Sequence, residues 1–170
     1  MKIFMVDAML GKLATWLRLT GHDAFYSTVM HDEDLLRIAL EERRVLLTSD
    51  AILCRRAEEA GIEVMLVRGT VDEEVASVFL KYGIIPEADP AKSRCTKCNG
   101  VLTHITEDEK HQIHGLVPDQ TYNHYSEFWF CKYCKSVFFQ GGQWTNIEEY
   151  MRRIAELMKE MREASNLREQ

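Results

Sequence analysis

The chain lacks any apolar stretch approaching the eighteen or so residues that a membrane span needs. Its N-terminal apolar run, residues 1–6, meets an acid at Asp7, which is too early for a signal peptide. We therefore expect a cytoplasmic protein with no membrane partner. Internal repeats and low-complexity segments are also missing, so a repeat architecture is not indicated.

An excess of basic residues is likewise missing. The net charge is −6, and residues 1–90 carry 10 Lys and Arg against 16 Asp and Glu. Affinity for nucleic acid comes mainly from Lys and Arg that neutralise phosphates. A nucleic-acid role would therefore need a divalent metal or a local basic face.

Cysteines are few, but four of the five form two C-x-x-C pairs about thirty residues apart. In a reducing compartment such pairs bind metal more often than they form disulfides. The spacing predicts a structural zinc ribbon over residues 92–145, with four thiolate ligands: Cys95, Cys98, Cys131 and Cys134. His111 and His114 could substitute as ligands, although four cysteines already complete the shell. Cys54 is expected to be a buried spectator.

Before the ribbon, short apolar runs alternate with helical patterns, which predicts an α/β domain with a parallel sheet over residues 1–88. Pro86 and Pro90 mark an acidic linker after it. The expected strands are residues 2–6, 24–26, 45–48 and 62–67, and the expected helices are 10–17, 31–40, 52–60 and 72–82.

Residues 146–170 read as an amphipathic helix, because apolar residues recur from Ile147 to Met161 at steps of three and four. This helix could dock on the body of the protein or pair with a second copy to form a homodimer.

Acidic residues follow the predicted strands. Asp7 and Asp50 come directly after the first and third strands, and Asp32 opens the helix after the second. Because the carboxyl ends of parallel strands share one edge, we expect these three acids to converge there, with Glu33, Asp34 and Asp72 nearby. Converging carboxylates repel unless a cation holds them, and hard oxygen ligands select Mg²⁺ or Mn²⁺. Each acid could instead be only a helix N-cap.

Several segments together resemble the mut-seven C-terminal ribonuclease family, PIN-like domains that carry a zinc ribbon. They are residues 7–14, 16–21, 31–36, 47–50 and 94–99: DAMLGKLA, WLRLTG, HDEDLL, LTSD and RCTKCN. The resemblance implies a PIN-like three-layer parallel-sheet domain followed by a zinc ribbon and a C-terminal helix. It also implies metal-dependent ribonuclease activity with catalytic acids at Asp7, Asp32, Asp50 and, more weakly, Asp34.

The chain departs from the family pattern after the second cysteine pair. Residues 138–144 read FFQGGQW, so that Gln143 stands where the family tends to have His. Aromatic residues around this segment should form the core of the ribbon, or offer one or two faces on which single-stranded bases stack. The basic residues expected to contact the RNA backbone are Lys12, Arg18, Arg55, Arg56 and Lys132, although each could be ordinary surface charge.

The sequence therefore favours a metal-dependent ribonuclease that hydrolyses RNA with help from the ribbon. A catalytically weak RNA-binding or regulatory adaptor is the main alternative. A phosphoryl-accepting receiver domain ranks lower, because nothing supplies the acid pair expected near the first strand or a Lys on a fifth strand.

Overall fold

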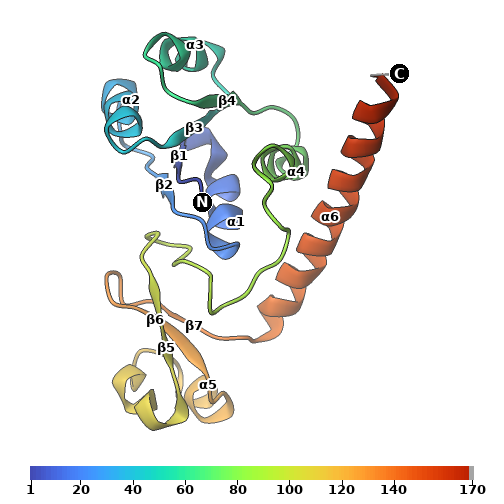
Figure 1. Ribbon diagram of the computed structural model, residues 1–170. Coiled ribbons are helices and arrows are strands. Elements are labelled where there is room, and N and C mark those ends of the chain that lie inside the picture. Colours follow the sequence, from blue (N-terminus) through green and yellow to red (C-terminus); the bar gives the residue numbers. More distant parts are fainter. Residues whose placement is uncertain (169–170) are drawn as a thin grey trace.

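The N-terminal half of the protein is an α/β domain built on four parallel strands (Figure 1). The computed structural model describes residues 1–168, so residues 169–170 of the predicted C-terminal helix lie outside the described part. The strand order is β2-β1-β3-β4, and the bounds are β1 Phe4–Val6, β2 Ala24–Tyr26, β3 Val45–Thr48 and β4 Val64–Leu66. The predicted parallel sheet is confirmed, with shorter first and fourth strands.

Helices cover both faces of this sheet. Alternate strand residues point to opposite faces. Phe4 and Leu47 pack with α1 (Gly11–Leu19), α4 (Val71–Tyr82) and α6 (Gly142–Arg168), whereas Met5 and Leu46 pack with α2 (Asp32–Glu41) and α3 (Ala51–Glu59). This three-layer arrangement confirms the predicted fold class. The helices of the domain are η1 Ala8–Leu10, α1 Gly11–Leu19, α2 Asp32–Glu41, α3 Ala51–Glu59 and α4 Val71–Tyr82. No helix within residues 1–168 is long and apolar enough to cross a membrane.

The second half, which includes the predicted ribbon of residues 92–145, contains a small antiparallel sheet, β5-β6-β7, with its own core of Ile105, Ile113 and Phe128. We refer to this part as the ribbon. Two short helices lie between its first two strands and cover this core. The bounds are β5 Leu102–Ile105, η2 Glu107–Ile113, α5 Asp119–His124, β6 Phe128–Cys131 and β7 Val137–Phe138.

The last helix, α6, spans Gly142–Arg168 and runs from the ribbon along the α/β domain beside α4 (Figure 1). It begins four residues before the start expected from its apolar periodicity. Its Met151, Ile154 and Met158 are buried in the core that α1 and α4 share, and Arg153 pairs with Asp72 at 2.9 Å. The helix therefore docks on its own chain, and a homodimer would have to use its other residues.

The ribbon attaches where the parallel strands begin. Asp23, just before β2, accepts hydrogen bonds from Arg44 of the domain at 2.7 Å and from Asn99 of the ribbon at 2.8 Å. Burial opposes ionisation of Asp23, but these hydrogen bonds outweigh it and lower the pKa of its carboxyl group. Arg94 of the ribbon lies 3.8 Å from the same carboxylate. The carboxylate of Asp23 thus joins the α/β domain and the ribbon.

Arg18 strengthens the same junction. Its side chain is only 4% exposed, and its guanidinium donates to the Ala24 carbonyl at 3.0 Å and to the Thr96 carbonyl at 2.8 Å. Arg18, which the sequence suggested as an RNA contact, is therefore buried at the junction, where two of its five N–H groups donate to backbone carbonyls inside the protein.

Replacement of Asp23 by Asn should weaken the junction. The pKa of Asp23 in the folded protein lies below the unfolded value of about 3.9. The carboxylate therefore contributes stability above that pH, which is lost as the pH falls through the folded pKa. We expect Asp23→Asn to lower the free energy of unfolding by about 2 kcal/mol at pH 7. As the pH falls below about 4, this free energy should then decrease less in the variant than in the wild type. Urea unfolding at several pH values measures both effects, with the exposed Asp108→Asn as the control. Equal pH profiles for Asp23→Asn and wild type would contradict this role.

Candidate functional site

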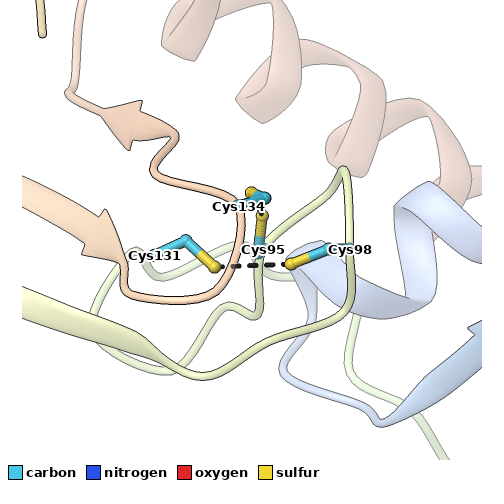
Figure 2. Close-up of side chains that lie close together, drawn as sticks. All are labelled: Cys95, Cys98, Cys131 and Cys134. Carbon is cyan, nitrogen blue, oxygen red and sulfur yellow. Dashed lines mark hydrogen bonds between the residues drawn. The ribbon is translucent and has the colours of Figure 1, made fainter.

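Four cysteines from two loops meet beside the junction (Figure 2). The sulfur of Cys95 lies 3.5 Å from that of Cys134, that of Cys98 lies 3.4 Å from that of Cys131, and all four lie within 4.8 Å of one another. A tetrahedral zinc with Zn–S bonds of about 2.3 Å requires sulfurs about 3.8 Å apart. The four thiols therefore fit a closed zinc site and could hold the ion.

Each cysteine pair sits in a tight turn that aims both sulfurs inward. The amide of Asn99 donates to the Cys95 carbonyl, and the amide of Lys135 donates to the Cys131 carbonyl, each at 2.8–2.9 Å. Asn99 and Lys135 both take positive φ values, 67° and 62°. Gly100 completes the first turn, since a Cβ there would lie 3.0 Å from the Cys131 sulfur.

Histidines take no part in this cluster. Among residues 1–168, the four cysteines are the only group of three or more His, Cys, Asp or Glu whose ligand atoms lie within 4.8 Å of one another. His111 and His114 lie at the exposed end of η2 instead. Cys54 is buried in α3, away from the other cysteines, as expected.

A second candidate site lies at the opposite edge of the parallel sheet, where β1 and β3 end. Asp7 follows β1, and its carboxylate accepts hydrogen bonds from the Ala8 amide at 2.7 Å and from the Thr48 hydroxyl at 2.8 Å. Asp50 follows β3 and caps α3, with one oxygen accepting from the amides of Ile52 and Leu53. The amide of Asp50 donates to the Thr48 hydroxyl at 3.0 Å.

Thr48 therefore links the two acids, a role that was not among the expectations from the sequence. Its side chain is fully buried, and it is the only polar residue in the otherwise apolar β3. A hydroxyl that both donates and accepts holds Asp7 and the backbone of Asp50 in a fixed relation. The signal was present in the sequence, as a buried polar residue two positions before an acid.

Asp32 is not brought into contact with these two acids. It starts α2 and pairs with Arg56 of α3 at 3.4 Å, and the neighbouring Glu33 pairs with Arg56 at 3.0 Å. Asp34 faces Arg37 on its own helix at 3.5 Å. Among residues 1–168, the four predicted catalytic aspartates, Asp7, Asp32, Asp34 and Asp50, do not belong to any ligand cluster of the kind found at the cysteines. Asp32 and Arg56 instead form an ion pair beside the edge.

Other residues expected to contact RNA are exposed. Lys12 on α1 and Arg55 on α3 take part in no ion pair among residues 1–168, and Lys132 is exposed in the second cysteine turn. Lys132 lies with the ribbon at the junction end, whereas α3 begins at the acid edge. These cations therefore do not form one continuous patch.

Exposed apolar side chains surround the acid edge and were also missed by the sequence analysis. Met9, Val29 and Ile52 lie in the segments that follow β1, β2 and β3, and each is more than two-thirds exposed. Periodicity could not find them, because it assigns apolar residues to the core.

Comparison with known proteins identifies a family. The family model described as Mut7-C RNAse domain matches residues 2–151, which include the parallel sheet, the cysteine cluster and the start of α6. No curated protein and no solved structure matches the chain.

Loss of one exposed cysteine should remove the metal. Because a zinc site of this kind needs four thiolates, we expect Cys98→Ser to lose most bound zinc and to destabilise the ribbon. Zinc per protein, measured by elemental analysis after dialysis, tests this expectation. Cys54→Ser is the matched control and should keep its zinc. Full zinc retention by Cys98→Ser would argue against a four-cysteine site.

Proposed function

The chain belongs to the Mut7-C RNAse domain family, and we propose that it is a metal-dependent ribonuclease that hydrolyses RNA phosphodiester bonds at the acid edge of the sheet. Membership of this family points to a ribonuclease-like enzyme with RNA as its substrate. The observation that carries the proposal is the linkage of Asp7 and Asp50 through Thr48, on adjacent strands of the parallel sheet.

Asp7 and Asp50, with Asp32 as a third ligand, would hold Mg²⁺ or Mn²⁺. Carboxylate oxygens are the ligands that these hard cations prefer. A bound ion would supply positive charge for the phosphate and lower the pKa of a water molecule that attacks it. The hydrogen bonds from Ala8, Thr48 and the first amides of α3 keep Asp7 and Asp50 in place, so little ordering is needed when a ligand arrives.

Asp32 can join these acids only when its ion pair with Arg56 opens. The pair is more than a third exposed on each side, so opening it costs little. Arg56 also pairs with the exposed Glu33 at 3.0 Å, so its guanidinium is free to pair with a phosphate of the RNA beside the same edge only when both ion pairs open. Arg56 would thus act as an RNA contact and Asp32 as a metal ligand only in the substrate complex.

The ribbon has a structural role in this proposal. Zinc closes the two cysteine turns and leaves no open position for catalysis. Folding of the ribbon would present Lys132 to RNA, at the end of the domain opposite the acids.

A second candidate function is an RNA-binding adaptor with weak hydrolysis. It is favoured by one observation, that the carboxylates of Asp7, Asp32 and Asp50 are each satisfied by local hydrogen bonds or an ion pair and form no tight ligand cluster. The first experiment below separates the two functions.

Asp7→Asn should abolish metal-dependent cleavage. We expect a rate at least about a hundredfold lower in Mn²⁺, a larger loss than is typical for a residue that only orients a ligand. Asn still caps η1, so the fold should be retained. Labelled structured and unstructured RNAs are incubated with Mn²⁺, Mg²⁺ or EDTA, with Asp119→Asn as the control. Cleavage that survives Asp7→Asn, or that is absent from the wild type while RNA binds, would favour the adaptor.

Thr48→Val tests the linkage between the acids. Valine keeps the shape of threonine but cannot bond Asp7 or the Asp50 amide, so we expect cleavage to fall by about 10- to 100-fold with RNA affinity unchanged. Thr48→Ser restores the hydroxyl and should recover most of the rate. An equal loss in Val and Ser variants would point to packing of the buried methyl group instead.

A further inference from the structure

An aromatic pocket of about 300 Å³ lies between the α/β domain, the linker, the ribbon and the start of α6. All three tryptophans of the chain, Trp16, Trp129 and Trp144, line it, together with Phe138 and Phe139. Trp16 comes from α1, Trp129 from β6 and Trp144 from α6. The pocket therefore exists only when the ribbon is docked on the domain.

The segment FFQGGQW, whose aromatic residues were expected to form ribbon core or base-stacking faces, supplies much of this wall. Phe138, Phe139, Gln143 and Trp144 all line the pocket. Gln143 is the residue that departs from the family pattern. Its amide offers both a donor and an acceptor, as recognition of a base edge requires.

Trp129 adds an unmatched donor. Its neighbour Phe128 belongs to the core of the ribbon, so Trp129 lies on the opposite face of the small sheet, paired across strands with His104 and Phe138. Trp129 is 6% exposed, and its indole N–H is buried without an acceptor among residues 1–168. Buried indole N–H groups usually find a partner. The pocket is thus lined by a tryptophan whose indole N–H is unsatisfied among the described residues.

We propose that this pocket binds one unpaired base of the RNA, and this inference rests on the proposed function only in taking RNA as the ligand. Aromatic walls stack any base, and the few polar groups among them suit a planar heterocycle better than a purely apolar molecule. The volume of about 300 Å³ is sufficient for one base.

Lys12 on α1 lies between the pocket and the acid edge. Trp16 and Lys12 lie one helical turn apart on the same side of α1, and Lys12 is exposed without an ion pair among residues 1–168. The nine residues of α1 span about 14 Å, and Asp7 lies just before its N-terminal end. A strand anchored by a base in the pocket would therefore pass its phosphates over Lys12 before reaching the acids.

Tryptophan fluorescence provides a direct test, since every tryptophan lines the pocket. Zinc-loaded, full-length Asp7→Asn protein is titrated with AMP, GMP, CMP and UMP, and with A10 and U10 RNA, so that binding is measured without cleavage. We expect saturable quenching by at least one monophosphate and tighter binding of a decamer. Lys12→Met should weaken decamer binding without changing monophosphate binding. It should also reduce the slope of log affinity against log salt concentration by about one, because one phosphate contact is lost.

Two pocket variants and one control determine whether the nucleotide binds in this pocket. Thr15→Met fills the pocket from α1, and Trp144→Leu removes one aromatic wall. Each should weaken monophosphate and decamer binding at least about tenfold. Tyr133, an exposed aromatic residue outside the pocket, serves as the control, and Tyr133→Ala should change binding less than about twofold.

Three results would overturn the proposal. They are absence of quenching by every nucleotide and decamer, binding that depends on Tyr133 rather than on Thr15 and Trp144, and quenching by an apolar dye alone. Cleavage by the wild type is assayed separately. Pocket-dependent binding without cleavage would reject the proposed nuclease activity but retain the base pocket. Cleavage without such binding would retain the nuclease activity but reject the base pocket.

Discussion

Parallel pairing of the four strands is the constraint on which the rest of the structure depends. Because every strand of the sheet runs the same way, all of its carboxyl ends lie at one edge and all of its amino ends at the other. Asp7 and Asp50 follow strands and so meet at the first edge. Asp23 and Arg44 precede strands and so meet at the second, where the ribbon docks. Helix α1 spans the distance between the two edges.

At the amino edge, buried charge is acceptable because each charged group is matched. The guanidinium of Arg18 is held by two carbonyls, and the carboxylate of Asp23 is held by Arg44 and Asn99. An unmatched group in this position would cost several kcal/mol, by the penalty for burying a lone charge of about 3–5 kcal/mol. Docking of the ribbon supplies the partners Asn99 and Thr96, so folding of the ribbon and orientation of the two modules are coupled.

At the carboxyl edge the charged groups are not buried. Its acids are partly exposed, and local groups hold them: Thr48 and the first amides of helices for Asp7 and Asp50, and Arg56 for Asp32. N-capping and metal binding are thus not rival explanations for the same aspartate. The cap on α3 uses one oxygen of Asp50, which accepts from two amides, and Asp7 accepts one hydrogen bond on each oxygen. The other lone pairs of both carboxylates stay available for a cation.

The sequence by itself determined the alternation of strands and helices, the four-cysteine cluster and the position of Asp7 and Asp50 at strand ends, because periodicity, spacing and local turn signals encode them. Family resemblance added the expected activity. Tertiary structure alone decided that Arg18 is a buried junction residue, that Asp32 pairs with Arg56, and that three tryptophans far apart in the chain share one pocket. The reason is physical: burial and long-range pairing depend on which surfaces pack together, and no local pattern around Arg18 or Trp129 records the partner brought to it from elsewhere in the chain.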